Sequence, residues 1–469
     1  MQPATAEVAA LVTSRYNFRV PTEGGELLFN ARTGAVLKLS GESAATLAGA
    51  LSEGFAECAV GDLPPELAAR LCDGGFLVPA GTDELVEIRG RFQQARARSP
   101  VVLTLTTTMD CNLGCYYCYE SRSKRRLDNS HLADILALVE PGLRDAPELG
   151  LHVDWYGGEP TLNLGFIEAA SEALQGLCRK LQAPYSASII SNGTSWPADV
   201  EDFVRRHRIR QAQISFDGLA ENHNLRRRYR KGYEAAVPSF DLAVALVDRL
   251  LEVTRVDIRF NTDHGNAGDL LPFVAFVRDR GWFARRHPAV IQPARLANYS
   301  ERSAFMERSQ LPLEEFDRLR AALRDVAGTD FAIEESEAPD GFPYPRTSVC
   351  AALARGSLVV GAEGLQYRCG LQVGETGRAV GRVGGPAGEK FADKDWWEAF
   401  DPTVQPSCSR CSFLPVCWGG CPKKHLEKDA HALHETSIFW RTNLPRLVAS
   451  RFNLKPLPGF AYGESDQFR

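Results

Sequence analysis

Short apolar runs alternate with longer, partly polar segments through the middle of the chain. Each run has the length of a buried strand, and the segments between the runs have the apolar spacing of helices. Strands that alternate with helices are typical of βαβ units with a parallel sheet. The predicted strands are Val101–Leu105, Val153–Tyr156, Ala187–Ile190, Gln213–Phe216, Val256–Phe260 and Ala289–Ile291, and the helices between them include Leu164–Leu181, Pro197–His207, Phe240–Glu252 and Asp269–Arg280.

Six units of this kind predict an α/β fold with a partial (β/α)6 barrel of the TIM type over residues 96–330. In such barrels the active site lies at the carboxyl ends of the parallel strands. Loops that directly follow the predicted strands are therefore the first places to look for chemistry.

Both ends of the chain depart from this pattern. Residues 1–95 are predicted to form a small α+β domain, with Glu84–Ser99 as a charged helical connector. Residues 331–469 are rich in glycine, proline and cysteine and have few long helical patterns before Pro445, which predicts a module organised by metal. The elements predicted near the N-terminus are strands over Asn17–Val20, Leu27–Phe29 and Ala35–Leu39, helices over 40–51 and Pro65–Cys72, and an apolar segment at Phe76–Val78.

Composition narrows the classes of function. A chain of 469 residues with 44% apolar residues is long enough for two or three domains with sizeable cores. The formal net charge of −5 gives no reason to expect nucleic acid or an anionic membrane as a partner. No stretch approaches the roughly 18 apolar residues of a membrane span, and the N-terminus lacks a secretory pattern. We therefore expect a cytoplasmic protein.

The twelve cysteines are unevenly distributed. Three lie within eight residues from Cys111, six lie between Cys350 and Cys421, and the other three are Cys58, Cys72 and Cys178. A disulfide framework is not expected in a cytoplasmic protein, so the two groups predict metal sites. The three separate cysteines are predicted to be simply buried.

The first group has the spacing C-x3-C-x2-C and directly follows the first predicted strand. Its thiolates suit an iron–sulfur cluster or zinc. Three cysteines can hold three irons of a 4Fe–4S cube and leave the fourth iron open, whereas structural zinc usually takes a fourth nearby Cys or His. Ferredoxins typically have the cysteine spacing C-x2-C-x2-C with a further cysteine, which differs from the spacing of this group. A structural zinc site and a plain electron-transfer cluster are the alternatives. The residues of this group are Cys111, Cys115 and Cys118.

This motif, in this position, resembles the signature of the radical S-adenosylmethionine (SAM) superfamily. The resemblance implies that the open iron binds the amino and carboxylate groups of SAM. It also implies that SAM is cleaved reductively to a 5′-deoxyadenosyl radical, which abstracts a hydrogen atom from the substrate. Tyr117 matches the residue that packs near the adenine in that family.

Three later segments agree with this resemblance. Gly157-Gly158-Glu159-Pro160 resembles the GGEP motif that binds the SAM amino group, with Glu159 as an acceptor for the ammonium. Ser191 and Asn192 resemble the polar residues that reach the ribose and carboxylate. A third segment, in which Ser215 is the candidate SAM contact, resembles a run found in peptide-modifying members. That segment is Ser215-Phe216-Asp217-Gly218 with His223 and Arg226-Arg227, and Asn261 is a further cavity candidate.

Taken without the resemblance, parts of these segments have ordinary alternatives. Asp217 is also a common turn residue, and the two arginines are also compatible with a solvated face. The sequence assigns no catalytic base.

The second cysteine group resembles the SPASM extension of radical SAM proteins, which binds two auxiliary 4Fe–4S clusters. For this chain the resemblance implies one or two auxiliary iron–sulfur clusters. Taken alone, C-x2-C-x5-C-x3-C suits zinc equally well. The family pattern has one more cysteine downstream, and this chain has none after Cys421. Ser437, His431, His434 and Glu435 lie near the missing position. The resemblance assigns Cys350, Cys369 and Cys421 to one cluster and Cys408, Cys411 and Cys417 to the other.

The resemblance implies an enzyme that modifies a ribosomally synthesised peptide or protein and receives electrons from a flavodoxin- or ferredoxin-type donor. The N-terminal domain loosely resembles PqqD-like domains, which hold a peptide at a sheet edge, although a plain packing domain is an alternative. A sulfatase-type formylglycine maturase is a second hypothesis, weakened because Gly370 follows Cys369 where that family commonly has an aspartate. A third is a non-enzymatic iron–sulfur electron-transfer or regulatory protein.

Overall fold

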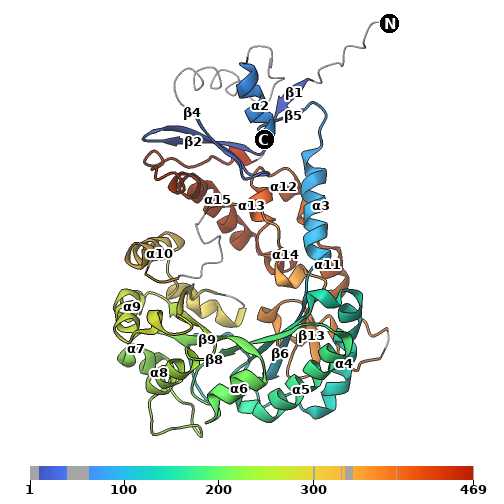
Figure 1. The fold of residues 1–469 in the computed structure, drawn as a ribbon, viewed down its shortest axis with the longest axis vertical. Coiled ribbons are helices and arrows are strands. Elements are labelled where there is room, and N and C mark those ends of the chain that lie inside the picture. Colours follow the sequence, from blue (N-terminus) through green and yellow to red (C-terminus); the bar gives the residue numbers. More distant parts are fainter. Residues whose placement is uncertain are drawn as a thin grey trace. The chain divides into compact units, whose positions relative to one another are not determined.

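The computed structural model describes residues 10–39, 63–298, 301–328, 330–332, 342–386 and 388–467 (Figure 1). The chain forms two compact units that are not continuous in sequence. The first contains Met1–Arg98, Ser336–Ala354 and Ala399–Arg469, and the second contains Ser99–Glu335 and Arg355–Glu398. The helix predicted over 40–51 and the lone Cys58 lie outside the described residues.

The second unit is built on a nine-stranded sheet with the order β11-β10-β9-β8-β7-β6-β12-β13-β14. Strands β6 to β11 are parallel neighbours in chain order, as predicted for six consecutive βα units. The sequence did not reveal that β12 extends this sheet in parallel beyond β6. The strands are β6 Val101–Thr108, β7 Leu151–Gly157, β8 Tyr185–Ser191, β9 Ile209–Phe216, β10 Arg255–Thr262, β11 Val290–Arg295, β12 Ser357–Val360, β13 Leu365–Tyr367 and β14 Gly381–Arg382.

Helices connect these strands and bury their apolar faces against the sheet (Figure 1). The core includes Trp155 and Phe216 from the strands and Phe273 from a covering helix, all completely buried. The predicted α/β class is therefore confirmed, and each predicted helix of this region is present within a few residues of its expected ends. The helices are α4 Leu132–Asp145, α5 Leu164–Leu181, α6 Val200–Arg206, α7 Ala220–Arg226, α8 Ser239–Leu250, α9 Leu270–Asp279, α10 Leu313–Ala327 and α11 Lys394–Ala399.

The first unit combines two small antiparallel sheets with helices from both ends of the chain. One sheet has the order β2-β3-β4, and the other pairs β1 with β5. The prediction of a small α+β arrangement near the N-terminus agrees with these elements. They are β1 Leu11–Thr13, β2 Asn17–Thr22, β3 Gly25–Asn30, β4 Val36–Leu39, α2 Pro65–Asp73, β5 Leu77–Pro79, α3 Glu84–Ala97, α12 Pro406–Ser409, α13 Leu414–Cys417, α14 Pro422–Leu426 and α15 Ala430–Ser450.

Helix α15 is a long helix in the region predicted to have few, and it continues through Pro445. Proline has no backbone N–H, so the helix loses the hydrogen bond to the carbonyl of the residue four positions earlier. That carbonyl belongs to Arg441, and it accepts a hydrogen bond from the backbone N–H of Tyr462 at 3.1 Å instead. The C-terminal segment thus satisfies the group that the proline leaves unpaired.

The compact units do not coincide with the three predicted domains, because the N-terminal elements pack with the C-terminal cysteine-rich elements. The predicted division at residues 95 and 330 stays a prediction. None of the helices in the described part of the chain combines the length and apolar character that crossing a bilayer requires.

Candidate active site

A cavity of about 340 Å³ lies in the second unit, where the carboxyl ends of strands β6 to β10 meet. The structure brings together there most of the residues that the motifs nominated, but Glu159, Asp217, His223 and Arg226 do not line the cavity. The nominated lining residues are Cys111, Cys115, Tyr117, Cys118, Gly157, Gly158, Ser191, Asn192, Ser215 and Asn261.

Hydrogen bonds to charged side chains hold the start of the loop that carries the three cysteines. The Cys111 backbone N–H donates to the Asp110 carboxylate at 2.9 Å. Arg230 donates to the same carboxylate oxygen at 2.9 Å and to the Cys111 carbonyl at 2.7 Å. Farther along the loop, the Gly114 N–H donates to the Arg228 carbonyl at 2.7 Å. Ion-assisted bonds of this kind are the stronger ones in proteins, so the loop is held in one conformation.

The three thiols share a poorly hydrated environment. Burial raises the pKa of Cys111 to about 12, and the negative charges of Glu159 and of the neighbouring cysteines act in the same direction. Burial likewise raises the pKa of Cys115 and of Cys118. A bound metal reverses this preference, because its positive charge stabilises the thiolates that coordinate it. The site therefore fits a metal centre.

Among the described residues, no three His, Cys, Asp or Glu side chains converge on the position of a single ion. An iron–sulfur cube does not require such convergence, because each thiolate binds a different iron. Three cysteine side chains spread around one cavity are compatible with that arrangement.

The two glycines of the GGEP segment lie against the backbone that leads into the cysteine loop. A Cβ added to Gly157 would lie 2.3 Å from the Thr108 carbonyl oxygen, and one added to Gly158 would lie 2.4 Å from the Asp110 carbonyl oxygen. Gly157 also has a φ of +140°, which side-chain-bearing residues rarely adopt. The glycines therefore permit a close approach between the ends of strands β6 and β7.

Glu159, the expected acceptor for the SAM ammonium, has hydrogen-bond partners within the fold, and its role toward SAM stays a prediction. Its side chain is completely buried. Its carboxylate accepts hydrogen bonds from the Asn192 backbone N–H at 2.7 Å, the Ser191 hydroxyl at 2.9 Å and the Thr161 hydroxyl at 2.6 Å. This geometry makes Glu159 a positioning residue that ties the segment after β7 to the segment after β8.

The run after β9 forms a buried ionic network. Asp217 is completely buried and accepts hydrogen bonds from the Tyr117 hydroxyl at 2.8 Å and from Arg227 at 3.3 Å. Arg226 makes a bidentate pair with Asp263, at 3.0 and 3.1 Å. The interpretation of these arginines as a solvated face is therefore wrong. Because Arg227 also donates to the Tyr117 hydroxyl at 2.6 Å, the network fixes a ring that lines the cavity.

Residues 105–261 match the family model of the radical SAM superfamily, and this span begins at β6 and ends in β10. This chain carries a radical SAM domain. The prediction made from the cysteine motif is confirmed at the level of the superfamily.

Solved structures resemble the radical SAM domain together with much of the remaining chain. A structure of anSMEcpe with bound AdoMet is 18% identical, with a TM-score of 0.55, and covers 76% of this chain and 100% of that chain. A second anSMEcpe structure, with bound AdoMet and Cp18Cys peptide, is 17% identical with the same TM-score and covers 76% of this chain and 99% of that chain. SuiB of Streptococcus suis bound to S-adenosylmethionine is 16% identical, with a TM-score of 0.50, and covers 89% of this chain and 97% of that chain. The likeness concerns the fold, and it extends beyond the radical SAM domain as expected from the resemblance to the SPASM subgroup.

His223 of the radical SAM domain packs between Phe216 and Phe240 rather than in the cavity. Burial, with a smaller contribution from the charge of Arg227, holds its pKa well below the usual value. The unfolded chain takes up a proton on this histidine below about pH 6.5, and the folded chain does not. Folding stability should therefore fall as the pH drops from about 6.5 towards the pKa of the folded state.

We expect His223→Leu to reduce the loss of stability between pH 7 and pH 5, measured as the change in the urea midpoint of unfolding. Burial also lowers the pKa of His207, to about 4, so some pH dependence remains in the variant. An unchanged difference between the two midpoints would show that His223 is not neutral in the folded protein.

Several lining residues of the radical SAM domain were missed in the sequence. Gln213 and Arg259 lie two positions before Ser215 and Asn261 on their strands, so the strand period of two was a usable signal. Tyr156 precedes the GGEP segment, and its hydroxyl donates to Glu120 at 2.5 Å. Burial raises the pKa of Glu120 to about 7. Leu371 comes from the distant segment 355–398, and no local pattern could have placed it at the cavity.

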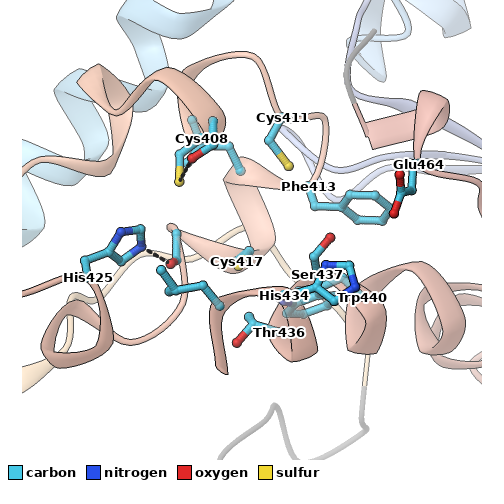
Figure 2. Close-up of a pocket in the computed structure, with 14 residues that line it drawn as sticks. Cys408, Cys411, Phe413, Cys417, His425, His434, Thr436, Ser437, Trp440 and Glu464 are labelled. Carbon is cyan, nitrogen blue, oxygen red and sulfur yellow. Dashed lines mark hydrogen bonds between the residues drawn. The ribbon is translucent and has the colours of Figure 1, made fainter. Parts of the chain in front are cut away.

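A second cavity, of about 300 Å³, lies in the first unit and is lined by Cys408, Cys411 and Cys417 (Figure 2). The predicted grouping of these three cysteines agrees with this arrangement. Cys350 and Cys421 are exposed residues of the first unit, and Cys369 belongs to the second unit, so their grouping stays a prediction. Of the separate cysteines, Cys178 is buried and Cys72 is half-buried.

Proposed function

We propose that this protein reductively cleaves SAM to a 5′-deoxyadenosyl radical and uses it to modify a ribosomally synthesised peptide or protein. The observation that carries the proposal is the cavity at the ends of β6 to β10. Three cysteines share it with Gly157 and Gly158, Ser191, Asn192 and Ser215. The cavity thus combines soft metal ligands, polar side chains and backbone that no side chain covers. A site for a cluster and a polar cofactor requires all three.

The donor set fits a 4Fe–4S cluster with SAM. Cys111, Cys115 and Cys118 would hold three irons, and the cluster with SAM bound to it would supply the radical chemistry. The backbone at Gly157 and Gly158 would approach the amino group closely, because no side chain intervenes there. Ser191, Asn192 and Ser215 would orient the polar parts of SAM, and the Tyr117 ring would pack against the adenine.

We propose that the chain's own residues orient the cofactor and exclude water from its pocket. Arg227 is almost completely buried, and its Nε has no hydrogen-bond partner among the described residues. It faces the same cavity as the thiolates, where its positive charge favours anionic groups. The network of Arg227, Asp217 and Tyr117 would keep the cofactor pocket in its binding shape.

A peptide substrate is supported by the anSMEcpe structure that contains Cp18Cys peptide, and by the small sheet of the first unit. Within the described residues, β4 pairs with β3 alone, so its outer edge can accept an extended segment. At the other edge of this sheet, Thr22 of β2 forms an antiparallel bridge with Pro456. We propose that the β4 edge holds part of the substrate peptide and that a flavodoxin- or ferredoxin-type protein supplies the electron.

Two alternatives make different predictions. A formylglycine maturase would act on a cysteine or serine of a sulfatase, and a sulfatase gene beside this one would favour it. A short neighbouring gene that encodes a repetitive or cysteine-containing peptide would favour the peptide maturase. An iron–sulfur electron carrier would bind clusters but would not consume SAM.

The test is anaerobic reconstitution of the full chain with iron and sulfide, followed by reduction with dithionite in the presence of SAM. We expect 5′-deoxyadenosine and methionine to form together, measured by liquid chromatography with mass spectrometry. Deuterium transfer from a labelled candidate peptide into 5′-deoxyadenosine would identify the substrate. Reconstituted, reduced protein that makes no 5′-deoxyadenosine would overturn the proposal.

A further inference from the structure

The second cavity contains more metal-binding groups than its three cysteines. One wall is formed by α12, α13 and the connecting turns, which carry Cys408, Cys411 and Cys417. The opposite wall is one face of helix α15, from which His434 and Ser437 line the cavity (Figure 2). Residues three apart on a helix lie on the same face, so both side chains approach the cavity from one side.

The three cysteines line the same cavity. Two polar atoms next to these cysteines in the chain, Ser412 Oγ and Trp418 Nε1, are buried and have no hydrogen-bond partner among the described residues. Neither residue lines the cavity, and the groups that could bind metal there are the side chains on its walls.

Apart from the hydroxyls of Ser407 and Thr436, the cavity offers four further groups that could complete the ligand set, and three of them are poor candidates. His425 Nε2 is already held by the Gly419 carbonyl at 2.7 Å. The Glu464 side chain is 76% exposed, and a carboxylate prefers harder metals than iron in a sulfur-rich site. The Ser437 hydroxyl is a neutral oxygen ligand, which is weaker than imidazole for iron.

His434 differs from these three groups. It is exposed where the cavity meets solvent, and none of the described residues hydrogen-bonds to its ring. Its imidazole is therefore available without breaking an existing interaction. His431 on the same helix does not line the cavity, and its side chain is 85% exposed.

We propose that Cys408, Cys411 and Cys417 bind an iron–sulfur cluster whose fourth protein ligand is the imidazole of His434. This extends the proposed function, on which the presence of auxiliary iron rests, by naming a mixed thiolate and imidazole ligand set. Imidazole is neutral where thiolate is anionic, so the cluster carries less negative charge and is reduced at a higher potential than an all-thiolate cluster. Ligation requires the unprotonated ring and releases a proton when the ring starts protonated.

The test uses the full chain in which Cys111, Cys115 and Cys118 are all replaced by alanine, so that the SAM-binding cluster is absent. The protein is labelled with 15N-histidine, reconstituted with iron and sulfide, and reduced. We expect pulsed electron paramagnetic resonance to show a strong nitrogen coupling to the cluster. The coupling should disappear in His434→Ala and remain in the matched control His431→Ala, which changes a histidine of the same helix outside the cavity.

If His434→Ala loses its cluster, the second variant, His434→Cys, still tests the proposal. This variant should retain the iron, lack the nitrogen coupling and show a lower reduction potential than the parent protein. A parent protein without nitrogen coupling, a coupling that survives in either His434 variant, or zinc in place of iron would overturn the proposal. Because the SAM-binding cluster is absent throughout, these results do not depend on SAM cleavage, and each proposal can fail while the other stands.

Discussion

Replacing Cys118 with alanine should abolish the formation of 5′-deoxyadenosine from SAM. Cys118 shares the cavity with the other two thiols of the motif, and a cube held by three thiolates loses one iron anchor when any of them is removed. The open iron and its bound cofactor are then no longer held in one place. We expect iron content to fall by up to about four atoms per chain, the content of one cube, while iron bound by the other cysteines remains.

Cys178→Ala is the matched control for this prediction. Cys178 lies in α5, is 1% exposed and packs in the apolar core of the same unit, so its loss should create a small cavity. The expected effect is about 1 kcal/mol of destabilisation with unchanged iron and SAM cleavage. Iron analysis, visible absorption and product chromatography measure both variants. Retained cleavage in Cys118→Ala would show that this cysteine is not a ligand of the SAM-binding cluster.

The strand pattern predicted the position of this site better than it predicted the role of each residue. Six lining segments follow or end the neighbouring parallel strands β6 to β11, and parallel strands end at the same sheet edge. The alternation of apolar runs with helices was therefore enough to predict that Cys111, Ser191 and Ser215 lie close together. The chain order of β6 to β11 is also their order in space, which is the simplest topology for βα units.

Roles that depend on burial were harder to predict. The sequence did not reveal that the Glu159 carboxylate accepts hydrogen bonds from Ser191 and Thr161 inside the fold. Arg226 and Arg227 look like surface residues in a run of arginines. Their carboxylate partners are 37 residues away, at Asp263, and 10 residues away, at Asp217. No local period contains that information, because partners so far apart in sequence meet only through the fold.

The arrangement of the units was beyond prediction for a related reason. The sequence changes character near residues 95 and 330, and these changes suggested three consecutive domains. The first unit joins segments that are distant in sequence, and Arg96 of α3 donates hydrogen bonds to the carbonyls of Leu353 and Phe400 within it. The strand β12 joins the parallel sheet for the same reason, although it follows the barrel region in sequence.

Gly158→Ala should disturb the cysteine loop strongly, although the substitution adds only one methyl group. The added Cβ would lie 2.4 Å from the Asp110 carbonyl oxygen and 3.0 Å from that of Met109. Both obstacles are backbone atoms, which cannot rotate aside as a side chain can. The same Asp110 carbonyl accepts the Glu159 N–H at 2.9 Å, so the two segments cannot separate without losing that bond. We expect a destabilisation of at least about 3 kcal/mol, at the upper end of the range for overpacking.

The functional consequence follows from the position of Asp110, which directly precedes Cys111 and holds its backbone N–H. A shift of Asp110 moves Cys111, the first of the proposed cluster ligands, so Gly158→Ala should retain less iron at the proposed SAM-binding site and lose most SAM cleavage. Gly165→Ala is the control, because a Cβ at Gly165 meets nothing within 4 Å and the residue lies in the first turn of α5. That variant should be as stable as the parent or more stable by up to about 1 kcal/mol, since alanine favours the helix. Thermal unfolding with iron analysis compares the two, and equal iron retention in both would show that the glycine is not needed for the approach between β6 and β7.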